Sequence, residues 1–261
     1  KIYVNGEEVT VDETDSDATD YTSDAGDNLF VGNSAAGTRT FHGCITEISM
    51  WREVLTQSEV NNLYNDGKAL DLVNEYVGDN LAATFANGTT STFDTFSSSG
   101  NNISAAVDDD DSSIQGCVSG TNFNVTTGEK FRLDMDVTVN SVSGTDSDIT
   151  VGIASGASGH GTNRSLTLDI AESGTYSTII TATGTSAEAR LQLNTENSAD
   201  NKANFSASNI RLYRLPTGYW RNNGLATWND LSENSNNGTV NNLTETILQQ
   251  AGVDASRDCQ G

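Results

Sequence analysis

The chain has 261 residues, of which 36 are acidic and 13 are basic, so its formal net charge is -23. This charge argues against binding of nucleic acid or of an anionic membrane through a basic face. It favours a soluble surface in a salty or divalent-rich medium, where counter-ions screen the self-repulsion. The remaining polarity comes from Asn, Ser, Thr and Gly, with a single proline, Pro216, as expected for many short strands joined by turns.

The three cysteines, Cys44, Cys117 and Cys259, lie far apart without a C-x-x-C spacing, which speaks against a metal cluster. Their odd count cannot close into disulfides within one chain, so buried or unpaired thiols are expected. No apolar run approaches the ~20 residues of a membrane-spanning helix, and we expect no membrane insertion. No signal peptide is visible, and the chain opens on Lys1 rather than Met, so we expect an excerpt from, or a processed part of, a longer protein.

The first unit is expected to span residues 1–72. Residues 1–11, KIYVNGEEVTV, predict a β-hairpin, because apolar residues alternate on both sides of an Asn-Gly turn. An acidic loop follows, and residues 28–32, NLFVG, predict a further strand. Residues 45–51 predict a fourth strand, with Ile48 and Met50 on the same face.

A short helix is predicted near residues 56–66. Thr56 is the expected N-cap, and Glu59 three residues later completes a capping box. Gly67 is expected to end the helix in the left-handed conformation. The apolar stripe that we expect to face the protein consists of Val60, Leu63 and Tyr64.

The second unit is expected to span residues 91–214, after a connection over residues 73–90. Six short apolar-polar alternations separated by Gly, Ser and Asn turns predict a two-sheet β-sandwich. The clearest is residues 131–139, FRLDMDVTV. Residues 215–261 are expected to be a linker or the start of a further domain. The predicted fold class is all-β, with tandem jelly-roll or β-sandwich modules and one short α-helix.

Residues 1–67 resemble the closing half of a laminin G-like, concanavalin A-type lectin domain. The resemblance rests on IYVNG, LFVGN, FHGCITEISMW and LTQSEVNNLYN in that order. The opening strands of such a domain are missing, although YWRNNGLATWNDLSENSNNGTV resembles the way one often begins. Residues 91–214 resemble carbohydrate-binding-module sandwiches, in particular those repeated in bacteriophage tail-fibre and other virion structural proteins.

Catalysis is not expected within this sequence. His42 and His160 lie near no recognisable nucleophile motif. Glucanases with a concanavalin A-type fold carry paired carboxylates in an E-x-D-x-x-E strand. The comparable strand here, CITEISMW, retains one acid, Glu47, and lacks the partner two residues later.

Two acidic segments could bind calcium, because hard divalent cations need several oxygen ligands from one loop. The alternative is that both are solvated loops of a very acidic chain, and neither has EF-hand spacing. The candidate ligands are Asp15, Asp17, Asp24 and Asp27 in the first segment, and Asp108, Asp109, Asp110 and Asp111 in the second.

Sugar binding would require an exposed aromatic side chain beside amide or carboxylate groups. Trp51 and Tyr64 are expected to belong to the core. Trp220 and Trp228 are the candidate glycan-binding aromatics, together with Asn222 and Asn229, and packing at a domain junction is the alternative.

Taken together, these features lead us to expect a non-catalytic structural or adhesion protein of a virion surface, or an extracellular one. Such a phage tail-fibre or capsid-decorating protein would bind a host-surface glycan or other virion proteins, as a homo-oligomer with a trimer among the options, and calcium would be a structural cofactor. Two alternatives remain open. One is a set of accessory carbohydrate-binding modules of a secreted polysaccharide-degrading enzyme, and the other is a purely architectural spacer.

Overall fold

The structure is a computed structural model of the whole chain. It describes residues 1–10, 28–32, 34, 36, 38, 41, 45, 47–68, 70–75, 78–89, 92–107, 115–143, 149–155, 165–195, 202–221, 227–232 and 234–239, without the side chains of 165–167. The chain divides into two compact units, one made of residues 1–77 with 216–261 and the other of residues 78–215. The second unit is therefore inserted, in sequence, into the first.

The first unit begins with the predicted hairpin, in which β1 (Ile2–Val4) pairs antiparallel with β2 (Glu7–Val9). Asn5 and Gly6 turn the chain with φ angles of 53° and 83°. Two successive left-handed residues make a turn whose twist matches that of the strands, and Asn-Gly adopts this conformation readily. The sequence prediction of a hairpin is confirmed.

The predicted helix is α1 (Gln57–Tyr64), followed by a single 3-10 turn, η1 (Asn65–Gly67). Its capping box is present: the Glu59 amide donates to Thr56 Oγ1 at 3.3 Å, and the Thr56 amide donates to Glu59 Oε2 at 2.7 Å. The helix ends earlier than predicted, because Asn65 rather than Gly67 is the left-handed C-cap, with φ 43°. Asparagine adopts this conformation more easily than most residues, so the chain turns before it reaches the glycine.

One prediction about α1 is wrong. Tyr64 was expected in the core but is 37% exposed. Its ring lies against Gly6 of the hairpin turn, where an added Cβ would be 3.1 Å from Tyr64 Cδ1. The short helix thus packs on the turn of the hairpin, and Gln57 Nε2 donates to the Gly6 carbonyl. Val60 and Leu63 are half-buried.

The other strands of the first unit form two small sheets. In one, β3 (Glu47–Met50) pairs antiparallel with β15 (Gly218–Arg221), and in the other β16 (Thr227–Trp228) pairs with β17 (Gly238–Thr239). Residues 216–221, expected to belong to a linker or a further domain, are therefore part of the first unit. The strand predicted at residues 28–32 is not formed, and Leu29 is 66% exposed there.

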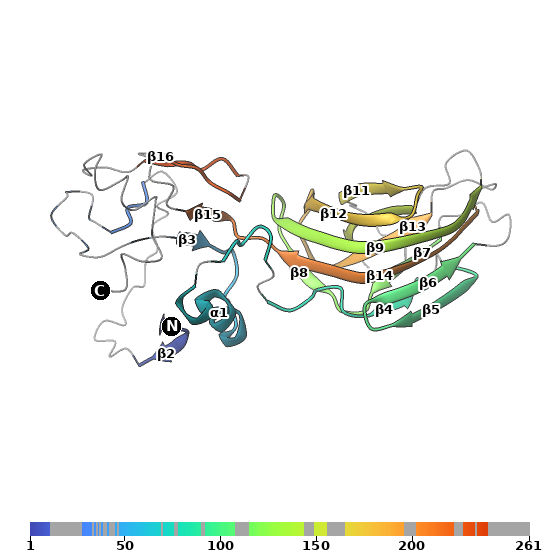
Figure 1. The fold of residues 1–261 in the computed structure, drawn as a ribbon, viewed down its shortest axis with the longest axis horizontal. Helices are drawn as coiled ribbons and strands as arrows, with labels where there is room; N and C mark the ends of the chain where they lie inside the picture. Colours follow the sequence, from blue (N-terminus) through green and yellow to red (C-terminus); the bar gives the residue numbers. More distant parts are fainter. Residues whose placement is uncertain are drawn as a thin grey trace. The chain divides into compact units, whose positions relative to one another are not determined.

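The second unit is the predicted two-sheet β-sandwich (Figure 1). We call its sheets sheet 1 and sheet 2. Sheet 1 has the order β11 (Ser165–Ile170), β10 (Ile149–Ser155), β13 (Ser186–Thr195), β7 (Gly116–Ser119) and β4 (Phe85–Asn87), with β8 (Phe123–Val125) also pairing with β13. Sheet 2 has the order β12 (Gly174–Thr181), β9 (Lys130–Ser143), β14 (Lys202–Arg214), β6 (Asn102–Ala106) and β5 (Thr95–Ser99).

The core of the sandwich follows the predicted alternation. Phe131, Leu133, Met135 and Val137 on β9 are at most 4% exposed, whereas the residues between them face outward. Burial of such side chains stabilises the fold by about 1.5–3 kcal/mol each. The all-β fold class is thereby confirmed, with one described α-helix.

The two chain ends of the sandwich lie side by side. Asn80 Nδ2 donates to the Ile210 carbonyl at 2.8 Å, and the Leu212 amide donates to Asn80 Oδ1 at 2.9 Å. The Leu81 amide donates to the Leu212 carbonyl at 2.9 Å. Residues 80–82 and β4 thus belong to the sandwich, although residues 73–90 were expected to be a connection.

Candidate functional site

The outer face of sheet 1 carries three neighbouring polar side chains, which we call the polar strip: Thr150, Gln192 and Asn194. On β13, Leu191 and Leu193 face the core, so that Gln192 and Asn194 face outward. Thr150 lies opposite Asn194 on β10. All three side chains are at most 1% exposed.

Glycine and valine residues of the neighbouring strands adjoin the polar strip. Gly152 lies opposite Gln192, and Gly116 lies opposite Asn194. Both glycines are buried, and Val118, which lies opposite Gln192 on β7, is 2% exposed. Buried amide and hydroxyl groups require partners, and each of these three side chains has an interaction within the protein; Thr150 Oγ1, for example, donates to the Asn194 carbonyl at 3.4 Å.

Arg190 extends the polar strip along β13. It is half-buried and lies two residues before Gln192, opposite Ala154 on β10. Its Nη1 donates to the Ser119 and Gly120 carbonyls, both at 2.7 Å. These contacts hold the guanidinium group in place at one end of the strip.

The outer face of sheet 2 is polar but is internally paired. Arg132 forms a two-point ion pair with Asp134, with Nε–Oδ2 at 2.8 Å and Nη2–Oδ1 at 3.2 Å. Asp136 accepts from Asn209 Nδ2 and from Thr175 Oγ1, both at 2.7 Å, and these hydrogen bonds lower the pKa of its carboxyl group. This face has the character of a solvated surface.

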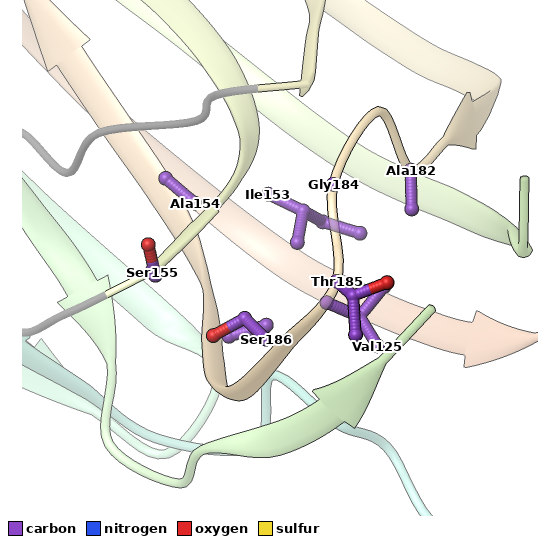
Figure 2. A pocket seen from close by; sticks show the side chains of 9 residues that line it. Val125, Ile153, Ala154, Ser155, Ala182, Gly184, Thr185 and Ser186 are labelled. Carbon is purple, nitrogen blue, oxygen red and sulfur yellow. The ribbon is translucent and has the colours of Figure 1, made fainter. Parts of the chain in front are cut away.

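A small hollow lies at one end of the sandwich, beside the loop that joins β12 to β13 (Figure 2). Val125, Ile153, Ala182, Thr185, Ser186 and Ala189 are among the residues that line it. Its empty volume is about 240 Å³ with open solvent included. Small-molecule sites usually have about 300–1,000 Å³, so this hollow is not a good candidate for a ligand pocket.

The predicted aromatic candidates lie in the first unit and are half-buried. Trp220 Nε1 donates to the Asn236 carbonyl at 2.7 Å, and the Trp220 ring covers Gly218, where an added Cβ would be 2.4 Å from Cη2. Trp228 lies on β16, opposite Gly238. Asn229 is exposed, and Asn222 lies outside the described residues. Both indole rings are thus partly covered by the protein.

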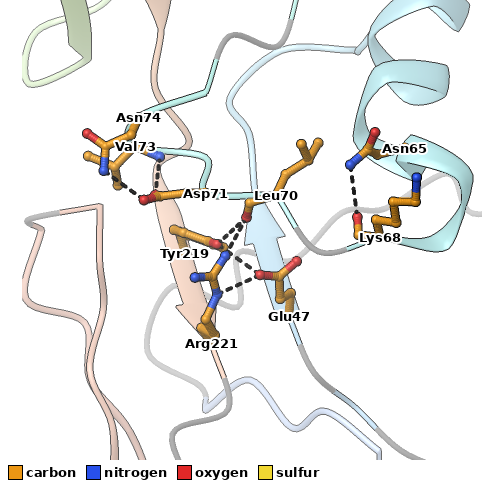
Figure 3. Close-up of polar contacts among 9 residues, drawn as sticks. All are labelled: Glu47, Asn65, Lys68, Leu70, Asp71, Val73, Asn74, Tyr219 and Arg221. Atoms are coloured by element: carbon orange, nitrogen blue, oxygen red, sulfur yellow. Dashed lines mark hydrogen bonds and ion pairs between the residues drawn. The ribbon is translucent and has the colours of Figure 1, made fainter. Parts of the chain in front are cut away.

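Glu47 has a structural role in the first unit (Figure 3). Its Oε1 accepts from Arg221 Nε at 2.7 Å and from the Tyr219 hydroxyl at 3.1 Å. The Tyr219 hydroxyl also lies 2.7 Å from the Leu70 carbonyl, to which Arg221 Nη2 donates. Burial, followed by the charge of Glu47, raises the pKa of Tyr219 to about 12.

Asp230 organises the turn between β16 and β17. Its Oδ1 accepts from the Tyr219 amide, the Ser232 amide and the Ser232 hydroxyl, and its Oδ2 accepts from the Asn236 amide. Burial alone would raise the pKa of this carboxyl group, but these hydrogen bonds outweigh it and the pKa lies below its ordinary value. The D-x-S-x-N-x-N sequence thus encodes a hydrogen-bonded turn.

The candidate calcium ligands at residues 15–27 and 108–111 lie outside the described residues, as do His42, His160, Cys44 and Cys259. Within the described part of the chain, no three His, Cys, Asp or Glu side chains are grouped as a metal site requires. Cys117 is buried in the sandwich core, and burial raises the pKa of its thiol to about 12.

Sequence comparison finds one family similarity, at the beginning of the chain. Residues 1–61 match the family described as the concanavalin A-like lectin/glucanases superfamily, in agreement with the predicted resemblance. No curated protein sequence matches the chain.

Solved structures of carbohydrate-binding modules resemble about half of the chain. The structure described as "CBM4 structure and function" shares 17% identity over 50% of this chain and 94% of its own, with a TM-score of 0.35. The N-terminal cellulose-binding domain of Cellulomonas fimi β-1,4-glucanase C shares 14% identity over 52% and 97%, with a TM-score of 0.34. A CBM29-2 mutant in complex with mannohexaose shares 11% identity over 51% and 92%, with a TM-score of 0.29. These values are too low to transfer a function.

The helices that the structure describes include none with the length and apolar character needed to cross a membrane.

Proposed function

We propose that this chain is a non-catalytic glycan-binding protein and that the outer face of sheet 1 is its binding face. The observation that carries the proposal is the polar strip, in which Thr150, Gln192 and Asn194 lie side by side on that face. The lectin-like match of residues 1–61 supports the same class of ligand.

The chemistry of the polar strip suits sugar hydroxyl groups. Each amide offers two donors and one acceptor oxygen, and the threonine hydroxyl can both donate and accept. A sugar hydroxyl also donates and accepts, so adjacent hydroxyls of one ring can bond to adjacent side chains. The strip is buried, which strengthens each hydrogen bond once made, and a ligand reaches it only if this face opens. Arg190, which lies next to the strip on β13, is half-buried and is therefore more exposed than the three residues of the strip.

We further propose that the protein works on a virion surface, as part of a phage tail fibre or a capsid decoration that attaches to a host-surface glycan. The strongly acidic composition and the presence of two β-modules in one chain support an exposed, extracellular role. Several copies in a homo-oligomer, for example a trimer, would increase the effective concentration of weak sites. The acidic segments at residues 15–27 and 108–111 are proposed to hold structural calcium.

An accessory module of a polysaccharide-degrading enzyme would use the same binding face, and the matched superfamily includes both lectins and glucanases. The two functions differ in the neighbouring domains of the natural protein. An architectural spacer differs from both, because it binds no glycan.

The test measures binding of the full chain to a glycan array and then the affinity for the best ligand by calorimetry. Gln192→Ala and Asn194→Ala should each lower the affinity by roughly 3- to 10-fold, as expected for one lost neutral hydrogen bond. The matched controls are Asn140→Ala and Asn204→Ala, which remove an amide pair from the outer face of sheet 2. Equal losses in both pairs, or no binding of wild-type protein to any glycan, would refute the proposal.

A second measurement needs no variant. The protein contains three tryptophans, Trp51, Trp220 and Trp228, all in the first unit. A glycan bound to the sandwich should raise its unfolding temperature in far-UV circular dichroism by mass action, while the tryptophan fluorescence transition stays in place. A ligand that shifts only the tryptophan transition would assign binding to the first unit instead.

A further inference from the structure

The two sheets of the sandwich end in four edge strands, β11 and β4 in sheet 1 and β12 and β5 in sheet 2. An edge strand has one row of backbone N–H and C=O groups without a partner strand, and proteins usually protect it by a short length, a charged side chain, a proline or a bulge. β4 and β5 have only three and five residues, whereas β11 carries Asp169 and pairs with a register shift beside Gly152. Three of the four edges are thus protected.

The fourth edge, β12, has none of these features. Its eight residues, GTYSTIIT, contain no charge and no proline, and they pair with β9 in an unbroken register from Gly174 to Thr181. Most of them are Thr, Ile or Tyr, which favour strands. Within the described part of the chain, no strand pairs with the other side of β12. The strand therefore offers a regular row of backbone groups to a further strand.

The hydrogen bonds next to β12 show which residues supply this row. The Ala182 amide donates to the Glu129 carbonyl at 2.8 Å, and the Gly128 amide donates to the Ala182 carbonyl at 2.8 Å, so Ala182 bonds toward the start of β9. Successive residues of an antiparallel strand bond to opposite sides, so every second residue before Ala182 also bonds toward β9. The residues between them point their N–H and C=O groups away from β9: Thr175, Ser177, Ile179 and Thr181.

A second copy of β12 fits this row. With a two-fold axis at Ser177, β12 pairs antiparallel with β12 of the other copy, and Thr175 then lies opposite Ile179, and Tyr176 opposite Thr178. Cross-strand pairs of β-branched and aromatic residues stabilise a sheet.

The charges near β12 favour this antiparallel arrangement. The nearest charged residue in the sequence is the exposed Glu172, two positions before the strand. Antiparallel pairing about Ser177 keeps the two Glu172 carboxylates about 34 Å apart along the strands, well beyond the screening length of about 10 Å. A parallel arrangement would place these carboxylates side by side, where they repel each other.

We infer that two copies of this protein associate through β12, which joins their sheets 2 into one continuous sheet. An uncharged strand is the contact that two chains of net charge -23 form with the least repulsion. The interface goes beyond the proposed glycan binding and does not depend on it.

The experiment measures the association of the full chain by sedimentation velocity over a range of protein concentrations. About 0.15 M salt screens the long-range repulsion between copies but not the contact between opposite side chains. Wild-type protein should form a reversible dimer. Ser177→Lys and Ser177→Glu each place two like charges opposite each other at the axis, and each should raise the dissociation constant of the dimer by roughly 5-fold.

Two further samples serve as controls. An equimolar mixture of Ser177→Lys and Ser177→Glu should form the dimer again, because the charges at the axis are then opposite. Ser97→Lys changes an exposed residue of β5, at the other edge of sheet 2, and should dimerise as wild type does. The unfolding temperature in far-UV circular dichroism checks that each variant is folded.

The possible results decide the matter. A dimer that Ser177→Lys weakens and the mixture restores supports the inference, even where Ser177→Lys alone is less stable, because mixing does not repair a folding defect. A dimer that Ser177→Lys leaves unchanged, or that Ser97→Lys weakens equally, overturns it. A monomer at every concentration also overturns it and leaves β12 to a strand of a different protein. A trimer overturns it as well, since self-pairing of β12 joins only two copies.

Discussion

Glu47 and Arg221 lie directly opposite each other on β3 and β15, with Glu47 Oε1 and Arg221 Nε 2.7 Å apart, although 174 positions separate them in the sequence. Through this pair and Tyr219, the chain segment after the sandwich is bound to the segment before it. The insertion of residues 78–215 is therefore bridged by one small cluster of the first unit.

The first prediction concerns that cluster. Glu47→Ala should lower the free energy of unfolding of the first unit by about 1–2 kcal/mol, because it removes the acceptor of two hydrogen bonds, one of them charged. Tryptophan fluorescence during urea unfolding reports this unit specifically. Glu8→Ala, which breaks the exposed ion pair with Lys1, is the control and should change stability much less. Equal effects of the two substitutions would contradict the role given to Glu47.

The second prediction concerns the chain ends of the sandwich. Asn80→Ala removes a side chain that bonds the Ile210 carbonyl and the Leu212 and Ala82 amides. The loss should destabilise the sandwich by about 2–3 kcal/mol, since buried backbone groups lose their partners. Far-UV circular dichroism should show the shift and tryptophan fluorescence should not. A parallel shift of both signals would mean that the two units unfold together.

The third prediction concerns acid sensitivity. Because the pKa of Asp230 is lowered in the folded protein, its ionised form stabilises the first unit fully above the ordinary value of 3.8. This contribution is lost as the pH falls below that value and passes through the folded pKa. Asp230→Asn should therefore destabilise the first unit at pH 6 and change it much less at the acid end of the range. Tryptophan-monitored urea unfolding at a series of pH values measures this, and a constant difference across the range would contradict it.

The fourth prediction concerns Cys117. Its thiol is buried and its pKa is raised to about 12, so the thiolate is scarce at any ordinary pH. In a Cys44→Ser, Cys259→Ser variant, a thiol reagent at pH 8 should react only as fast as the sandwich unfolds. The reaction in denaturant is the positive control. Rapid labelling of the folded variant would show that the core opens locally near β7.

Elements whose structure depends on residues close together in the sequence could be predicted from local sequence patterns. The Thr56–Glu59 capping box and the Asn5-Gly6 turn form as predicted, since their hydrogen bonds and backbone angles are decided within a few positions. The alternation of residues 131–139 likewise gives β9 its buried face. The position of Tyr64 could not be read in this way, because it depends on Gly6, which approaches from a distant part of the chain.

Only part of the candidate site could be predicted from the sequence. The segment ARLQLNT, residues 189–195, predicted a strand correctly, but nothing in it marked Gln192 and Asn194 as buried. Their burial arises from the folded sandwich and leaves no trace in the pattern of β13. Trp220 and Trp228 were predicted as candidate glycan-binding aromatics. The indole N–H of Trp220, however, donates a hydrogen bond to the Asn236 carbonyl.

The neighbouring ends of the sandwich have a consequence for how such proteins can diversify. Since Asn80 and Leu81 bond to Ile210 and Leu212, the sandwich begins and finishes at almost the same point. Another domain whose two ends lie similarly close together could replace the sandwich between residues 77 and 216. The distance between these two residues of the first unit would then stay the same. A different sandwich could thus replace the present one while the first unit keeps its own contacts.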